Sequence, residues 1–321
     1  MKVLIDTDPG CDDCAAITIF LSHPSAEVQA LTTVFGNSSV DVSTTNACRI
    51  LEFMSRKDIP IYKGAHKNLL GIDNISATWF HGKDGLNDVS HIIPMNTEKS
   101  AEQSRSAPEA IIELLKSHPG EISLIALGPL TNIAIATCLC PELPSLAKGL
   151  YLMGGSSYHG NVTRWAEYNF YADSLAAHVT LQAFSKSGLV HVVPWETCIN
   201  NTISLEKYHS LFEVPEKTPV HTLMKATGLA ETRLEREKKG ELDEYMFADQ
   251  FLPALLLYPE SVTKKELYKT VKVNYDINDE KRGQAEYVPH ENGESGGVGV
   301  VIYTHFDMEC IVNMYKNSIS G

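Results

Sequence analysis

Four aspartates lie within eight positions near the start of the chain, in the segment VLIDTDPGCDDCA at 3–15. These residues, Asp6, Asp8, Asp12 and Asp13, come directly after a short apolar run. Carboxylates so close together repel one another, and removing them from water is costly unless something neutralises them. The first question about this chain is therefore what supplies the compensating positive charge.

The expected positions of the aspartates limit which group can supply this positive charge. If 2–6 is a parallel strand, Asp6 and Asp8 lie at its carboxyl end, where open α/β sheets bind ligands. Asp12 and Asp13 open the next helix, whose dipole stabilises each charge by only about 0.3–1 kcal/mol. Four carboxylates need more, and oxygen-only ligands in a flexible cage favour Ca²⁺, with Mg²⁺ second. The alternative is a helix N-cap with solvated acids.

Apolar β-rich runs alternate with segments of helical periodicity along most of the chain. This alternation predicts βαβ units and an α/β fold with an open, mainly parallel sheet flanked by helices. The C-terminal third is more mixed, but no linker or repeat divides the chain, so we expect a single domain over 1–321. Expected strands are 2–6, 28–36, 60–62, 122–127, 149–155, 189–194, 268–275, 283–288 and 298–304, and expected helices are 12–24, 44–56, 130–139, 173–188 and 247–260.

Two further segments have a distinct composition. The segment 64–104 is rich in Gly, Asn, His and Asp, and is expected to be a long functional loop. Glycines cluster at 292–299, which is expected to form a turn before the last strand.

Composition excludes several classes of partner. No apolar stretch approaches the ~20 residues that span a bilayer, and a net charge of −13 disfavours nucleic acid. The one charge-dense stretch, at 232–244, mixes both signs and is expected to be a solvated helix or loop. The acidic residues that follow the first apolar run at once are unlike a signal peptide, so we expect a cytoplasmic protein.

The seven cysteines are odd in number and lie mostly in apolar patterns, which favours reduced, buried thiols. The Cys11-x-x-Cys14 spacing can mark a redox pair. The flanking aspartates would raise the pKa of a thiol there and weaken such a role.

The early acidic segment resembles the signature of the nucleoside hydrolase family, of the inosine-uridine-preferring type and its relatives. Four more segments resemble family blocks and occur in family order: TTVFGN at 32–37, HGKDG at 81–85, LGPLTNIA at 127–134, and the MGG…GNVTRWAEYNFYAD block at 153–173. Together they cover roughly residues 1–195, with a weaker likeness to the end. The resemblance implies a Rossmann-like nucleoside hydrolase fold, a ribonucleoside substrate, and a homodimer or homotetramer.

Members of this family cleave the N-glycosidic bond of ribonucleosides with water, which gives ribose and a free base. The resemblance implies that Ca²⁺ is bound by Asp8, Asp13, the carbonyl oxygen of Leu127 and Asp249, with Asp6 supporting Asp8. Asp8 would also be the general base toward a water that the metal activates. The bond would break through an oxocarbenium-like transition state that nearby carboxylates stabilise.

A further set of residues matches the ribose-contacting positions of the family. Carboxylates and amides can hydrogen-bond several hydroxyl groups, and a methionine can pack on the sugar. A site built around those hydroxyls should reject deoxynucleosides, because polar partners would be left unpaired. The matching residues are Asp12, Asn37, Met153, Asn161, Glu167 and Asn169.

The sequence differs from the family at the position of the general acid that protonates the leaving base. Several members carry a histidine immediately before the C-terminal metal aspartate, but Ala248 stands there in this chain. A lost general acid typically costs ~10²–10⁴-fold in rate. His81 is the expected catalytic replacement, and the segment WETC at 195–198 is assigned no chemistry. The aromatic candidates for stacking on the base are Trp79, Trp165 and Tyr245.

Three functions therefore remain open. The leading hypothesis is a Ca²⁺-dependent ribonucleoside hydrolase, with purine or pyrimidine preference undecided. Ala248 motivates the second, a catalytically weak or inactive nucleoside- or ribose-binding protein of the same fold. The third is a phosphatase of the haloacid dehalogenase type, because Asp6-x-Asp8 follows a strand, but a convincing lysine and acidic pair are missing.

Overall fold

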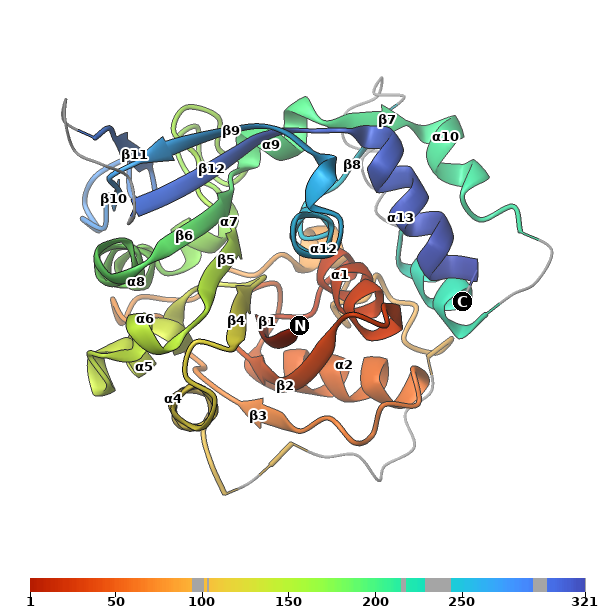
Figure 1. Ribbon diagram of the computed structural model, residues 1–321, viewed down its shortest axis with the longest axis horizontal. Coiled ribbons are helices and arrows are strands. Elements are labelled where there is room, and N and C mark those ends of the chain that lie inside the picture. The colour runs from red at the N-terminus through yellow and green to blue at the C-terminus, as the bar shows by residue number, and fades with distance from the viewer. Residues whose placement is uncertain (94–100, 103, 215–217, 229–243, 291–298, 321) are drawn as a thin grey trace.

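An eight-stranded sheet forms the centre of the molecule (Figure 1). The computed structural model describes residues 1–93, 101–102, 104–214, 218–228, 244–290 and 299–320. Seven strands run parallel and β9 is antiparallel at one edge, which confirms the predicted α/β class. In spatial order they are β3 (Ile61–Lys63), β2 (Glu27–Thr33), β1 (Lys2–Thr7), β4 (Ile122–Ala126), β5 (Gly149–Met153), β6 (Leu189–Val193), β12 (Gly299–Phe306) and β9 (Val262–Tyr268).

Helices cover both faces of the sheet, as the continuous apolar strands predict. Val3 and Ile5 of β1 point into one core, which contains α1 (Cys11–Ser22), α2 (Val40–Phe53), α12 (Phe251–Leu257) and α13 (Met308–Ser320). Leu4 points into the other core, with α4 (Ala107–Ser117), α5 (Thr131–Leu139), α6 (Leu143–Leu146) and α8 (Ser174–Ser187). Figure 1 shows the two groups of helices on opposite sides of the sheet.

Shorter elements complete the fold. Two small antiparallel pairs join β7 (Thr202–Ser204) to β8 (Glu244–Met246) and β10 (Thr270–Val273) to β11 (Ala285–Val288). Residues 219–228 are also helical. The remaining elements are α3 (Thr78–His81), α7 (Tyr168–Ala172), α9 (Trp195–Asn200), α10 (Leu205–Ser210) and the 3₁₀ helix η1 (Pro259–Ser261).

Several expected boundaries were wrong, mainly in the second half of the chain, although α2 also begins at Val40 and not at 44. The helix expected over 247–260 is limited to α12, followed by η1, and the strand expected over 268–275 is divided between β9 and β10. The expected loop 64–104 contains the short helix α3. The expected turn at 292–299 and the charged stretch at 232–244 lie outside the described residues, except for Gly299 and Glu244.

The oxidation state of the cysteines agrees with the prediction, but the burial of two of them does not. All seven cysteines are free thiols, but Cys138 is exposed and Cys310 is partly exposed, contrary to the prediction of buried thiols.

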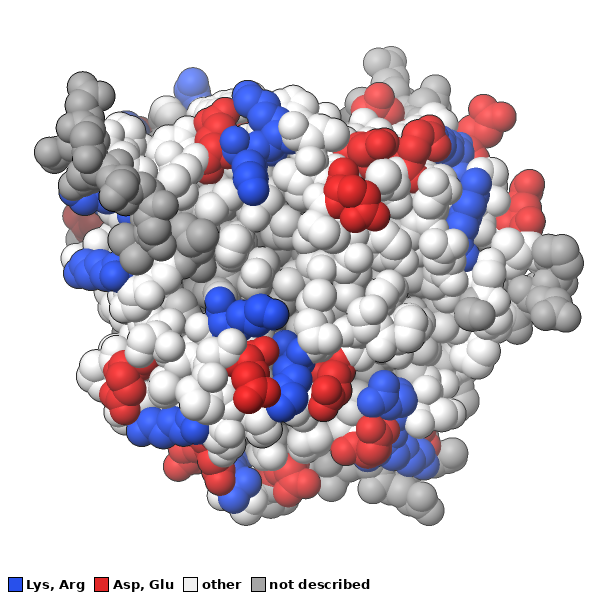
Figure 2. Space-filling view, in the orientation of Figure 1, with Lys and Arg blue, Asp and Glu red and all other residues white. Residues whose placement is uncertain are grey.

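Among the described residues, no helix is both long enough and apolar enough to cross a bilayer. On the face drawn in Figure 2, basic and acidic side chains are interspersed.

The strand order places a ligand-binding edge beside β1. From β1, the chain adds β2 and β3 on one side, whereas β4, β5 and β6 lie on the other side. The connections therefore reverse direction between β1 and β4, and crevices of this kind at the carboxyl ends of strands bind ligands. Asp6 pairs in register with Thr32 of β2 and Ala126 of β4, so three strands end at this point.

Asp173 connects the carboxyl edge of the sheet to α5 and α8. Its carboxylate accepts hydrogen bonds from the backbone N–H of Ala176 (3.0 Å), where α8 begins, from the Thr131 hydroxyl (2.7 Å) and from the N–H of Leu69 (2.9 Å). The side chain is fully buried. One carboxylate thus holds α5, α8 and the loop after β3 together.

We expect Asp173→Ala to lower the free energy of unfolding by about 3 kcal/mol, because it removes a helix cap and leaves buried donors unpaired. The matched control is Ser204→Ala, since Ser204 caps α10 through the N–H of Lys207 (3.1 Å) on the surface. That change should cost about 1 kcal/mol or less. Urea denaturation measures both, and equal losses would contradict the role assigned to Asp173.

Candidate active site

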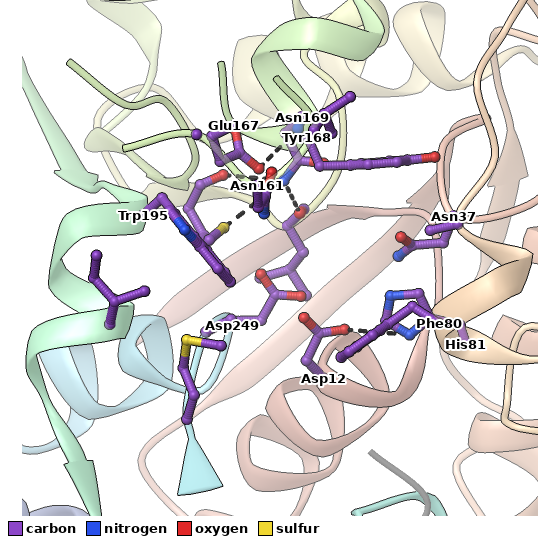
Figure 3. A pocket seen from close by; sticks show the side chains of 18 of the residues that line it. Asp12, Asn37, Phe80, His81, Asn161, Glu167, Tyr168, Asn169, Trp195 and Asp249 are labelled. Atoms are coloured by element: carbon purple, nitrogen blue, oxygen red, sulfur yellow. Dashed lines mark hydrogen bonds and ion pairs between the residues drawn. The ribbon is translucent and has the colours of Figure 1, made fainter. Parts of the chain in front are cut away.

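A cavity of about 450 Å³ opens at the carboxyl ends of β1, β2, β4 and β5. Figure 3 shows Asp12 and Asp249 close together in its middle, with Trp195 on one side and His81 on the other. Most of the predicted site residues line it, namely Asp12, Asn37, His81, Leu127, Met153, Asn161, Glu167, Asn169 and Asp249. Asp8 and Asp13 are buried next to it and are not among the lining residues.

An acidic cluster occupies the floor of this cavity. Asp12, Asp13 and Asp249 each offer a carboxylate oxygen, and these oxygens all lie within 4.8 Å of one another. Burial, together with Asp12, Asp13 and Asp8, raises the pKa of Asp249 well above its usual value. Burial also raises the pKa values of Asp12 and Asp13 to about 6. The cluster therefore carries an unfavourable concentration of negative charge that a cation would relieve.

One carboxylate oxygen of Asp8 accepts a hydrogen bond, and the other accepts none from the described residues. Its Oδ2 accepts a hydrogen bond from the backbone N–H of Asn37 (2.7 Å), whereas its buried Oδ1 accepts none from the described residues. Two glycines leave room for this carboxylate. A Cβ atom added to Gly36 would lie 1.9 Å from Oδ2, and one added to Gly128 would lie 2.4 Å from Oδ1. Any side chain at either position would displace Asp8.

Asp6 supports the floor differently from the prediction. Its Oδ1 accepts hydrogen bonds from the Thr32 hydroxyl (2.6 Å) and from Asn132 Nδ2 (2.8 Å), and burial raises its pKa to about 7. Its backbone carbonyl accepts from the N–H of Leu127 (2.8 Å). Asp6 thus ties β2 and α5 to β1 and places Leu127, and no hydrogen bond joins its side chain to Asp8 among the described residues.

The oxygen atoms around this floor are suitable ligands for a hard cation. Asp8, Asp12, Asp13 and Asp249 offer carboxylate oxygens here, and Leu127, which lines the same cavity, offers its backbone carbonyl oxygen. That carbonyl accepts one hydrogen bond, from Asn169 Nδ2 (2.8 Å), which leaves a second lone pair. An all-oxygen set of mixed carboxylate and carbonyl ligands suits Ca²⁺.

Glu167 and Asn169 form the wall above the floor. Glu167 caps α7, because its Oε1 accepts from the N–H of Asn169 (2.8 Å) and its Oε2 accepts from the N–H of Phe170 (3.1 Å) and Gly155 (2.8 Å). Burial raises the pKa of Glu167 to about 7. Asn169 Nδ2 also donates to the carbonyl of Met153 (3.2 Å). The wall is therefore fixed to the ends of β4 and β5, whereas Asn161 is exposed at the rim.

His81 is a neutral hydrogen-bonding group. Its Nδ1 accepts a hydrogen bond from the backbone N–H of Cys11 (3.1 Å), so the ring proton resides on Nε2. Burial lowers the pKa of His81 to about 4, although Asp13 acts in the opposite direction. Near pH 7 this histidine can donate a hydrogen bond from Nε2 but does not carry the extra proton of an imidazolium.

Two of the three aromatic predictions were wrong. Trp79 does line the cavity, with its side chain largely exposed. Trp165 instead lies beneath Arg164 and Lys281, each 4.9 Å from its ring centre, and outside the cavity lining. Tyr245 is buried against Tyr208, with ring centres 3.5 Å apart, and does not line the cavity either.

The structure adds wall residues that sequence reasoning missed. Trp195 follows β6 and lines the cavity, although its segment was assigned no chemistry. The position of WETC just after a strand was the available signal, because the carboxyl ends of parallel strands meet at one edge. Ala248 also lines the wall, so a small apolar side chain occupies that place. Other lining residues are Phe80, His159, Tyr168, Ile199 and Met246.

Comparison with known proteins shows to which family the chain belongs. The family model described as inosine-uridine preferring nucleoside hydrolase matches residues 3–312. The chain belongs to this family. A probable uridine nucleosidase 2 of Arabidopsis thaliana is 41% identical over 180 residues, which are 56% of this chain and 55% of that protein. The inosine-uridine preferring nucleoside hydrolase of Leishmania major is 38% identical over 182 residues, 56% of each chain. The chain thus spans little more than half the length of these relatives.

Solved structures of nucleoside hydrolases share the fold over the full length. The plant nucleoside hydrolase PpNRh1 has a TM-score of 0.87 at 27% identity, covering 100% of this chain and 99% of that one. An inosine-guanosine nucleoside hydrolase has a TM-score of 0.86 at 27% identity, with coverage of 99% and 98%.

In this nucleoside hydrolase family member, Glu196 fixes the loop that carries the exposed rim. Its Oε1 accepts three hydrogen bonds, from the Ser156 hydroxyl (3.0 Å) and from the backbone N–H groups of Ser157 (2.7 Å) and Tyr158 (3.1 Å). The next residues along this loop, 159–162, line the cavity. Glu196 is buried, so its loss would leave these donors without a partner.

We expect Glu196→Ala to increase amide hydrogen exchange at Ser157 and Tyr158 by about 10- to 100-fold, the equivalent of a lost hydrogen bond to a charged group. Glu196→Gln keeps an acceptor oxygen at Oε1 and should remain near wild type at both amides. Exchange within α8 serves as the internal control. Unchanged exchange at both loop amides in the alanine variant would show that Glu196 does not hold the loop.

Proposed function

We propose that this protein hydrolyses the N-glycosidic bond of ribonucleosides with water, using Ca²⁺ bound at the acidic floor. The main observation in support of this proposal is that two sets of functional groups lie together in one cavity. A cluster of buried and half-buried carboxylates lies beside a wall of amides and carboxylates suited to several hydroxyl groups. Family membership and relatives named as nucleosidases support it.

The residues that would hold Ca²⁺ are Asp8, Asp13, Asp249 and the carbonyl of Leu127. When bound, the ion would lower the pKa of a water molecule and orient it toward the anomeric carbon. The free Oδ1 of Asp8 makes this residue the candidate general base toward that water.

The wall residues would bind and stabilise the sugar. Asp12, Asn37, Asn161, Glu167 and Asn169 offer carboxylate and amide groups to the ribose hydroxyls, and Met153 offers an apolar contact. As the glycosidic bond breaks, positive charge develops on the ribose ring. The surrounding carboxylates would stabilise that charge.

The leaving base would be assisted from the other side of the cavity. The Nε2–H of His81 would donate a hydrogen bond to the departing base, while Trp79 and Trp195 offer aromatic surfaces. Ala248 provides no proton, so His81 is the proposed catalytic residue for this step. A homo-oligomer and a cytoplasmic location remain predictions.

Release of reducing sugar from a panel of ribonucleosides tests the proposal. Wild-type protein should turn over at least one of them, and a chelator should abolish the activity. Asp8→Asn should lower kcat by ~10²–10⁴-fold because the general base is lost. The control is Asp41→Asn, which removes only an exposed partner of Lys63 on α2. No release from any common ribonucleoside would refute the proposal.

The second candidate function is nucleoside binding with little catalysis, which Ala248 favours. Calorimetry distinguishes the two, since a binding protein would retain intact nucleoside in a Ca²⁺-dependent manner without product. Turnover at ordinary enzyme rates would eliminate this alternative.

The buried carboxylates also predict an unusual pH dependence of stability. Asp6, Asp12, Asp13 and Glu167 have pKa values raised to about 6 or 7, so their neutral forms are favoured in the folded state. The stability they confer is complete below the unfolded pKa of about 4 and is lost as the pH rises through about 7. The lowered pKa of His81 acts in the opposite direction, between about 4 and 6.5.

His191, whose pKa burial also lowers to about 4, acts in the same direction as His81. Four acids outweigh two histidines, so the melting temperature of chelated protein should fall between about pH 5 and pH 8. Ca²⁺ should raise the melting temperature more at the upper pH than at the lower, because it binds the ionised carboxylates. Differential scanning fluorimetry provides the measurement, with Asp249→Asn as a variant that should respond weakly. An equal Ca²⁺ effect at both pH values would argue against a metal at these residues.

The polar wall predicts discrimination between sugars. If amides and carboxylates bind the ribose hydroxyls, 2′-deoxynucleosides should have kcat/KM values lower by roughly 10⁴-fold, because a buried partner is left unpaired. Uridine against 2′-deoxyuridine, and inosine against 2′-deoxyinosine, are the comparisons to make. Similar values within either pair would mean that the wall does not bind the 2′-hydroxyl group.

A further inference from the structure

A second cavity, of about 280 Å³, lies toward the opposite edge of the sheet. Ser123 and Lys148 line it from the amino-terminal ends of β4 and β5, whereas Leu127 and Met153 line the candidate active site just after β4 and at the end of β5. Parallel strands place these two ends on opposite edges of the sheet. The second cavity is therefore separate from the proposed catalytic groups.

The strand register builds an aromatic wall in this cavity. Tyr151 of β5 is paired with His191 of β6, and Tyr303 of β12 is paired with Lys265 of β9. The rings of Tyr151 and His191 stack with centres 4.2 Å apart and planes within 6° of parallel. His191 Nδ1 and the Tyr303 hydroxyl are 2.7 Å apart. Leu255 and Val262 add apolar surface around these rings.

The charges that line the second cavity are all of one sign. Lys148 and Lys265 both line it, and neither side chain forms an ion pair or hydrogen bond with any of the described residues. No aspartate or glutamate of the described chain lines it. Burial and Lys265 lower the pKa of His191 to about 4, so this ring contributes a neutral hydrogen-bonding edge near pH 7. In a chain with net charge −13, a cavity lined by lysines without acids is a distinct local environment.

We propose that the second cavity binds a small organic anion that carries a flat ring. The ring would pack on the aromatic and aliphatic wall of Tyr151, Tyr303 and Leu255, and the anionic group would lie between the ammonium groups of Lys148 and Lys265. Unpaired ammonium groups recognise carboxylates and phosphates, and the apolar wall accounts for preference for a ring over a bare ion. This inference does not depend on the proposed catalytic function.

Titration with four probes tests the proposal in the presence of a chelator, so that no metal at the acidic floor can bind an anion. Benzoate and phenyl phosphate carry both a ring and a charge, benzyl alcohol carries the ring alone, and inorganic phosphate carries the charge alone. Ligand-observed NMR or calorimetry on the full chain should show saturable binding of benzoate, phenyl phosphate or both, below about 10 mM. The uncharged and ring-free probes should bind at least about 10-fold more weakly.

The double variant Lys148→Gln with Lys265→Gln should weaken that binding by about 10-fold or more. The matched control is Lys2→Gln with Lys264→Gln, since those lysines pair with Glu121 and Glu266 and do not line the cavity. Preference for benzoate or for phenyl phosphate identifies the anionic group. The proposal is overturned by no saturable binding, by equal binding of benzyl alcohol or inorganic phosphate, or by binding that survives the double variant.

Discussion

Repulsion among buried carboxylates at the end of β1 is the constraint on which the rest of the candidate site depends. Asp8, Asp13 and Asp249 are each at most 2% exposed, and burial together with mutual repulsion raises their pKa values. Folding can tolerate this arrangement only if donors, neutral protonated forms or a cation compensate for it. Gly36 and Gly128 leave space for Asp8, and backbone amides satisfy the outer oxygens. Asp8 Oδ1 accepts no hydrogen bond from the described residues, whereas both oxygens of Asp13 accept hydrogen bonds, from Thr7, Gly10 and Asn37. A free carboxylate oxygen held beside oriented ones is the arrangement expected of a metal site.

Hydrogen bonds between strand ends keep these oxygens in place. Asn169 bonds to the carbonyls of Leu127 and Met153, and so joins the ends of β4 and β5. Asn132 bonds to Asp6 and to the carbonyl of Thr33, and so joins β1 and β2 to α5. Each of these amides satisfies buried groups on two different elements, which makes the floor rigid without adding charge. Rigid placement matters because catalysis of this kind depends on groups that are already oriented before the reaction begins.

The two cavities differ because opposite edges of a parallel sheet collect different side chains. The carboxyl edge gathers acids from β1, α1 and the segment before α12, together with a neutral histidine. The cavity toward the amino edge gathers two lysines beside three stacked or hydrogen-bonded rings. One sheet therefore gathers acids at one edge and lysines toward the other, in keeping with the proposed cation and sugar site and the proposed anion site. β5 contributes to both, through Met153 and Tyr151.

By itself the sequence determined the βαβ alternation of the first two thirds and the position of the acidic cluster at a strand end, because apolar periodicity and strand polarity are local properties. Its resemblance to a family supplied Asp249 and the residues that we expect to contact ribose. Only the tertiary structure decided that Trp195 reaches the cavity while Trp165 and Tyr245 do not, that Glu196 holds the rim, and that His81 is neutral. These features depend on burial and on contacts between segments far apart in the chain, which no local pattern of residues records.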